Sequence, residues 1–135
     1  MKQFNPNKRF VSIDFDGTLT RPFVQRFVKQ IPDSIELIIL TSRFDDNHLI
    51  YSPAKVRNHD LWELIEKIGI ERERVYFLNH LNWKADFLCE YSEKLLFHLD
   101  DDEMEIEELL KIGLNGIQVK GQNIHSLNLE LNAKI

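Results

Sequence analysis

Hydrophobic and polar residues are distributed along the chain in two kinds of segment. Short apolar runs, of the length of a buried strand, are separated by amphipathic segments in which apolar residues recur every three or four positions. The apolar runs predict strands at 10–15, 35–40, 75–78, 95–99 and 116–120. The amphipathic segments predict a helix closed by Pro32, one from about Asn58 to Gly69, a short one over 83–91, and one from Glu103 to Gly113.

This alternation of strand and helix predicts the fold class. We expect an α/β protein with a three-layer α/β/α, Rossmann-like core and a five-stranded parallel sheet. Residues 42–56 are polar and irregular, and the weakly patterned segment 121–135 is expected to be a loose tail or a docking segment. Because no repeat or linker divides the chain, we expect a single domain over 1–135 with its core at about 9–120.

Composition narrows the range of partners and compartments. The chain of 135 residues carries a formal net charge of −5, so no global positive field attracts nucleic acid or an anionic membrane, although a local basic patch remains compatible with it. The only cysteine, Cys89, excludes an intrachain disulfide and is expected to be inert packing within its helix. Without a long apolar run or a signal-like start, the sequence predicts a soluble, cytoplasmic domain that does not contact membranes.

Carboxylates follow two of the predicted strands. Asp14 and Asp16 flank Phe15 and, by strand alternation, should point the same way, while Asp100 and Asp101 follow the fourth strand. Further polar groups come after the second and third strands: Thr41, Ser42, Arg43 and Lys84. Parallel strands bring their carboxyl ends to one edge, where ligands bind in such folds. The excess of negative charge there suits one divalent cation, and oxygen ligands favour Mg²⁺.

The order of these groups resembles the haloacid dehalogenase superfamily. Residues 14–20 (DFDGTLT) resemble its first motif, and the strand ending at Thr41 resembles the second. Lys84 resembles the third motif and Leu99-Asp100-Asp101 the paired acidic fourth. The resemblance covers roughly residues 9–120.

The resemblance implies a phosphatase with an aspartyl-phosphate intermediate. Asp14 would be the nucleophile, and Asp16 the general acid and base. Thr41 would bind a phosphoryl oxygen, with Ser42 and Arg43 beside it, and Lys84 would neutralise developing charge. Mg²⁺ would be held by Asp14, by the Asp16 backbone carbonyl and by Asp100, with Asp101 a further ligand through water or a partner of Lys84.

The spacing of the motifs leaves no room for a cap domain. Capless relatives tend to act on large substrates or on substrates that close the site themselves. A weaker resemblance, carried by Arg43, Trp62, Lys84 and the segments 99–101 and 112–113, is to the 3′-phosphatase domain of phage-type polynucleotide kinases. Phosphate ends of nucleotides or polynucleotides are therefore the leading substrate class. The alternatives are a small-metabolite or phosphoprotein phosphatase and a non-catalytic phosphate-binding module.

Several single residues have two interpretations. Arg43 is either a phosphate clamp or an ion-pair partner of Asp45 or Asp46. We expect His98 to be a buried, satisfied histidine rather than a ligand, whereas Trp83 either lines the site entrance or anchors its helix. In the loop 44–56 and just beyond it, four side chains either bind the leaving group of the substrate or are exposed loop residues without a role in binding: His48, Tyr51, Lys55 and Arg57.

Overall fold

A parallel sheet forms the centre of the computed structural model, which describes residues 5, 7–49, 57–121 and 124–135. Five strands pair in the order β3-β2-β1-β4-β5, all of them parallel. Their bounds are β1 (Phe10–Ile13), β2 (Glu36–Thr41), β3 (Val75–Phe77), β4 (Leu95–Asp100) and β5 (Gly116–Gln118). The central strands are almost continuously apolar because both faces of the sheet are covered, and the predicted fold class is confirmed.

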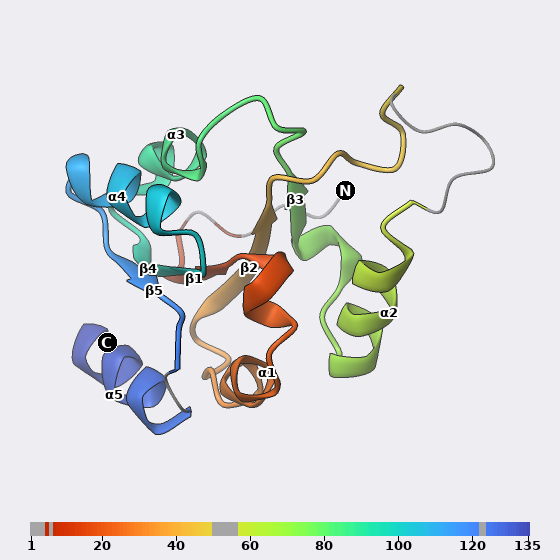
Figure 1. Ribbon diagram of the computed structural model, residues 1–135. Coiled ribbons are helices and arrows are strands. Elements are labelled where there is room, and N and C mark those ends of the chain that lie inside the picture. Colours follow the sequence, from red (N-terminus) through yellow and green to blue (C-terminus); the bar gives the residue numbers. More distant parts are fainter. Residues whose placement is uncertain (1–4, 6, 50–56, 122–123) are drawn as a thin grey trace.

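Helices cover both faces of the sheet (Figure 1). They are α1 (Pro22–Lys29), α2 (His59–Ile68), α3 (Lys84–Leu88), α4 (Glu103–Lys111) and α5 (Ile124–Lys134). Side chains of α1, α2 and α5 pack into one core cluster with Phe97, and those of α3 and α4 pack into the other with Phe10. Within the described residues, only α1 and the short turn η1 (Phe15–Leu19) lie between β1 and β2, so no cap is inserted there.

The sheet order places a switch point at β1. The chain runs outward from β1 to β2 and β3, then returns to place β4 on the other side of β1. Register pairs Ile13 with Leu99, so the residues that follow them, Asp14 and Asp100, lie next to each other. The Asp14 backbone N–H donates to the Leu99 carbonyl across a distance of 2.9 Å. Ligands of open α/β sheets bind at such a point, outside the carboxyl ends of the strands.

The predicted strands and helices are recovered with small changes at their ends. The first strand ends at Ile13 instead of Phe15, because the chain turns immediately into η1. The short helix over 83–91 divides into α3 and a 3-10 turn, η3 (Cys89–Tyr91). The expectation that Cys89 is packed within its helix is wrong, because this cysteine is exposed.

The C-terminal segment is a docked helix and not a loose tail. Leu127 and Leu131 of α5 are buried against the cluster that holds α1, whereas Leu129 is 56% exposed. The Arg9 guanidinium also donates to the Lys134 carbonyl at the end of the helix. Leucines at 127, 129 and 131 alternate with polar residues, a pattern typical of strands, and this explains why the sequence did not predict a helix.

We expect Leu127→Ala to lower the free energy of unfolding by about 2–5 kcal/mol, the usual cost of removing a buried leucine side chain. Chemical denaturation followed by circular dichroism measures this change. The matched control is Leu129→Ala in the same helix, which should change stability by less than about 0.5 kcal/mol because its side chain is exposed. Equal stability of the two variants would contradict the docking of α5.

No helix in the described part of the chain has the length and apolar character needed to cross a membrane.

Candidate functional site

The candidate site is a cavity of about 510 Å³ at the carboxyl ends of the strands. Its lining includes most of the residues singled out in the sequence: Asp14, Asp16, Ser42, Arg43, Lys84, Asp100 and Asp101. Thr41 is 1% exposed and is not among the lining residues. Its hydroxyl oxygen accepts the Arg43 backbone N–H, and the predicted contact of Thr41 with a phosphoryl oxygen remains a prediction.

Lys84 links the two strand ends that meet at the switch point. Its ammonium Nζ lies 2.7 Å from Asp14 Oδ1 and 2.6 Å from Asp100 Oδ2, and all three side chains are buried. Burial alone would lower the pKa of Lys84, but Asp14 and Asp100 raise it, so the ammonium stays charged. The expected alternative partner of Lys84, Asp101, makes no ion pair with it in the described residues.

The Asp14 side chain is buried and lies near other negatively charged groups. Burial raises its pKa to about 8, with help from the charges of Asp100 and Asp101 and against the opposing effect of Lys84. Its second oxygen, Oδ2, accepts the Thr18 hydroxyl at 3.1 Å. Thr18 belongs to the motif 14–20, but no role for it was predicted. A nearby divalent cation would favour the ionised form of Asp14, which is the nucleophilic one.

Asp100 and His98 form a buried pair behind the cavity. Asp100 Oδ2 accepts from His98 Nε2 at 2.8 Å, and His98 Nδ1 lies 2.9 Å from the Ser12 hydroxyl. Burial by itself would raise the pKa of Asp100, but hydrogen bonds from His98 and Lys84 lower it to about 2. Burial lowers the pKa of His98, so the neutral ring donates from Nε2 to Asp100 and accepts from Ser12. The prediction of a buried, satisfied histidine is confirmed.

Oxygen atoms of three carboxylates could hold a metal ion together. One oxygen each from Asp14, Asp100 and Asp101 lies within 4.8 Å of the others. The set consists of hard oxygen donors, and with Lys84 beside it the ionised cluster carries two uncompensated negative charges. These residues therefore fit a cation such as Mg²⁺.

Gly17 makes room for the third of these carboxylates. The residue has a φ of +72°, and a Cβ added to it would lie 2.2 Å from Asp101 Oδ2. Any other residue at position 17 would be strained and would displace Asp101. The Asp-Gly pair of the first motif thus shapes the turn and leaves space for a carboxylate from β4.

Asp16 lines the same cavity as Asp14 but lies outside that carboxylate cluster. The strand ends at Ile13, and strand alternation no longer applies where the chain turns through Gly17. Both oxygens of Asp16 instead accept from Arg43, at 2.9 Å from Nε and 2.8 Å from Nη2. The Asp16 side chain is 58% exposed, unlike that of Asp14 at 7%.

Arg43 joins Asp16 to helix α2. Its guanidinium also donates to both oxygens of Asp60 at 2.8 Å and to Asn58 Oδ1 at 3.4 Å, so that all five N–H groups have acceptors. These hydrogen bonds with Asp60 and Asp16 raise the pKa of Arg43, and the pKa of Asp60 falls to about 2. Asp60 was not predicted, although an acidic residue in the first turn of α2 is a recognisable signal.

The interpretation of Arg43 as an ion-pair residue is right, but its partners are Asp16 and Asp60 and not Asp45 or Asp46. Asp46 accepts instead from Asn58 and from the indole N–H of Trp62, and Asp45 accepts the Asn47 backbone N–H. Tyr51 and Lys55, two candidates for gripping the leaving group, lie outside the described residues.

A further residue missed by the sequence analysis holds the start of α3. Glu105 Oε2 accepts the Lys84 backbone N–H at 2.9 Å, and the Glu105 side chain is buried. Burial raises the pKa of Glu105. In the sequence, Glu105 belongs to an acidic run that the helix dipole already explains, so its contact with Lys84 had no local signal.

Comparison with known proteins adds information on the fold alone. Neither the scan against protein-family models nor the search of curated proteins finds a match. Among solved structures, the chain is similar to an uncharacterized protein from Corynebacterium glutamicum, with a TM-score of 0.57 and 15% sequence identity over 93% of each chain. The TM-score supports a shared architecture. Sequence identity this low carries no information on chemistry.

Proposed function

We propose that this chain is a Mg²⁺-dependent phosphomonoester hydrolase that works through an aspartyl-phosphate. The observation that carries the proposal is the bridge from Lys84 Nζ to Asp14 and Asp100, with Asp101 beside them. These residues come from three distant parts of the sequence and meet at the switch point of the sheet. Their arrangement agrees with the roles that the resemblance to the haloacid dehalogenase superfamily implies.

Each residue has a distinct task in this reaction. Asp14 attacks phosphorus, and the bond from phosphorus to the leaving oxygen breaks while Asp16 donates a proton to that oxygen. Asp16 then removes a proton from the water that attacks the aspartyl-phosphate, so that Asp14 and inorganic phosphate are released. Lys84 orients Asp14 and offsets negative charge on the phosphoryl group. When bound by Asp14, Asp100 and Asp101, Mg²⁺ would supply further positive charge to that group.

The contact between Asp16 and Arg43 limits when Asp16 can act. Both oxygens of Asp16 accept hydrogen bonds from Arg43, so neither is free to carry a proton to the leaving oxygen while both bonds persist. For its role as an acid, Asp16 has to gain a proton and give up at least one bond to Arg43. Arg43 would then have a donor for a phosphoryl oxygen of the substrate.

Phosphate release tests the proposal. The purified chain is given an aryl phosphate, acetyl phosphate, 5′- and 3′-mononucleotides, a 3′-phosphorylated oligonucleotide, sugar phosphates and a phosphopeptide, with Mg²⁺ or with a chelator. We expect release that requires Mg²⁺ and is fastest for a phosphate on a nucleotide or polynucleotide end. A folded protein that binds Mg²⁺ but releases no phosphate would instead support a phosphate-binding module.

We expect Gly17→Ala to weaken Mg²⁺ binding by about tenfold, because the new methyl group displaces the Asp101 carboxylate and strains the turn. Isothermal titration calorimetry with Mg²⁺ measures the change. Gly121→Ala is the matched control, since a Cβ there meets no atom within 4 Å. Unchanged Mg²⁺ affinity in Gly17→Ala would rule out Asp101 as a ligand.

A further inference from the structure

A second cavity adjoins the candidate active site. It has a volume of about 310 Å³ and is lined by residues 80–83 together with Ser42, Asp86 and Glu105. Ser42 and His80 line both cavities, so the two lie side by side. A group attached to a phosphate in the first cavity would lie next to the residues that line the second.

The loop between β3 and α3 presents apolar surface to this second cavity. Leu81 is 77% exposed and Trp83 is 40% exposed, although both side chains are large and hydrophobic. The loop is anchored, because the His80 N–H donates to the Ser42 carbonyl at 2.9 Å and the Leu81 N–H to the Leu78 carbonyl at 3.1 Å. Positive φ angles at Asn79 and His80 turn the chain so that the loop passes along the rim. We call residues 80–83 the rim loop.

The charges around the two cavities are unfavourable for a second phosphate. The described lining of the second cavity carries the carboxylates of Asp86 and Glu105 and neither lysine nor arginine. In the first cavity, Lys84 Nζ bridges Asp14 and Asp100 and faces the transferred phosphoryl group, and any donor that Arg43 gains from Asp16 serves that same group. A leaving group with its own phosphate would therefore meet like charge without a compensating cation.

We propose that the rim loop is a subsite for an uncharged, flat leaving group, so that the substrate is a nucleoside carrying a single phosphate. This inference rests on the proposed function and selects a mononucleotide over a polynucleotide end. A nucleobase has an apolar face that stacks on the exposed indole of Trp83 and packs against Leu81. A cationic leaving group would not gain from Leu81, although the carboxylates of Asp86 and Glu105, which accept the backbone N–H groups of Trp83 and Lys84, would attract it, and phosphocholine tests that alternative.

The test compares kcat/KM for five phosphates in the presence of Mg²⁺. They are acetyl phosphate, ribose 5-phosphate, a nucleoside 5′-monophosphate, the corresponding 3′,5′-bisphosphate and phosphocholine. We expect the monophosphate to exceed ribose 5-phosphate by about tenfold, in line with one stacked base. The bisphosphate should be about tenfold poorer than the monophosphate, and added salt should narrow that gap because it screens the repulsion.

Variants of the rim loop identify where the base binds. Trp83→Ala should reduce the preference for the monophosphate over ribose 5-phosphate to less than about twofold, and Trp83→Phe should retain most of it. Leu81→Ala should reduce the preference in part. The matched control is Leu110→Ala, an exposed leucine on α4 that lines neither cavity and should leave the preference unchanged.

The outcomes separate the two proposals. Hydrolysis of acetyl phosphate without a preference for the monophosphate, or with a preference that Trp83→Ala retains, overturns the subsite and leaves the phosphatase standing. Faster hydrolysis of the bisphosphate or of phosphocholine than of the monophosphate also overturns the subsite. If the folded protein hydrolyses none of the five, the phosphatase proposal fails and the subsite fails with it.

Discussion

Asp14→Asn is expected to reduce phosphate release by about four orders of magnitude or more, the scale of removing an essential nucleophile. The amide cannot form the bond to phosphorus, whereas the rest of the cavity is unchanged in shape. An asparagine oxygen can still accept from Lys84 Nζ, which lies 2.7 Å from Asp14 Oδ1 in the unmodified protein. The effect should therefore fall on chemistry and not on folding.

Stability measurements distinguish a loss of chemistry from a loss of folding in Asp14→Asn. Because burial raises the pKa of Asp14 to about 8, a neutral side chain is favoured at this position when no cation is bound. We expect Asp14→Asn to unfold, without Mg²⁺, at the same temperature as the unmodified protein or higher. Its stabilisation by added Mg²⁺ should be smaller, since one ligand is lost.

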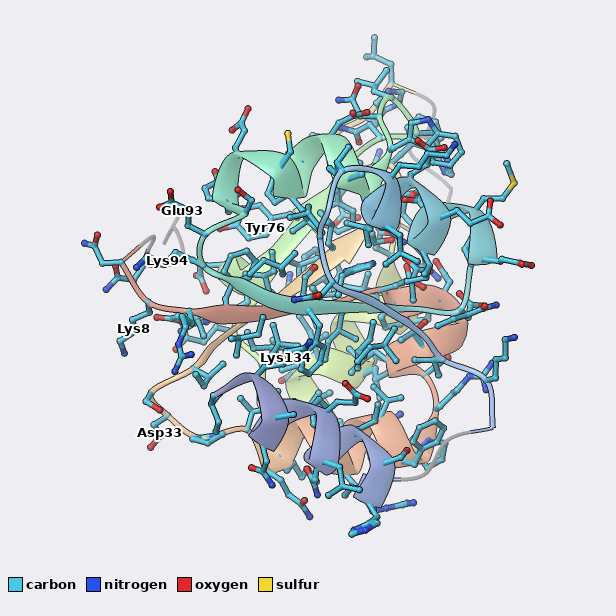
Figure 2. All side chains as sticks on the ribbon, turned by 90° about the vertical axis from the view of Figure 1, so that its left-hand side faces the viewer. Lys8, Asp33, Tyr76, Glu93, Lys94 and Lys134 are labelled. Atoms are coloured by element: carbon cyan, nitrogen blue, oxygen red, sulfur yellow. The ribbon has the colours of Figure 1, made fainter. Side chains whose placement is uncertain are left out.

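A covalent readout makes the test specific. Acid quenching during turnover of acetyl phosphate should trap phosphate on the protein in a form that hydroxylamine releases, and Asp14→Asn should trap none. Asp33→Asn is the control, because Asp33 is exposed and lies at the opposite, amino end of the sheet (Figure 2). Turnover that persists in Asp14→Asn would remove this residue as the nucleophile.

Lys84→Met should have the largest effect on folding among changes at the site. Without the ammonium, the buried carboxylates of Asp14 and Asp100 lose their shared cation, and breaking a buried ion pair costs about 3–5 kcal/mol. Turnover should also fall by at least about a hundredfold, because a preorganised charge next to the phosphoryl group is lost. Chemical denaturation and phosphate release measure the two effects separately.

Added Mg²⁺ and lower pH should each reduce the loss of stability in Lys84→Met. Added Mg²⁺ should restore more stability to the variant than to the unmodified protein, since the cation replaces part of the missing charge. The loss of stability should be smaller near pH 5 than near pH 8. The pKa of Asp14 is raised to about 8, so near pH 5 its carboxyl is protonated and neutral, and the absence of the Lys84 ammonium then costs less.

Lys94→Met is the control for Lys84→Met, and it also tests whether Lys94 could neutralise the phosphoryl charge in place of Lys84. Lys94 precedes β4 and lies at the amino end of the sheet, opposite the cavity (Figure 2). We expect this variant to retain turnover. A loss of turnover in Lys94→Met together with normal turnover in Lys84→Met would reverse the assignment.

The pattern of residues along the chain predicted the parallel sheet, four of the helices and the edge where the polar groups gather. Strands and helices follow from apolar periodicity, which is a local property of neighbouring residues. The carboxyl ends of parallel strands share one edge, so residues as distant as Asp14, Lys84 and Asp100 could be placed together without knowledge of their contacts. Helix α5 was missed because the alternation of its leucines resembles a strand.

The contacts among these groups depend instead on strand register and on the conformation of the turns. Register between β1 and β4 sets Asp14 beside Asp100, whereas the turn at Gly17 directs Asp16 to Arg43 and Asp60. The second cavity depends on how the rim loop passes beside Ser42, a residue of a different strand end. These contacts join segments that are far apart in the chain, and they depend on strand register and loop conformation. A local sequence pattern describes neighbouring residues only and therefore does not predict them.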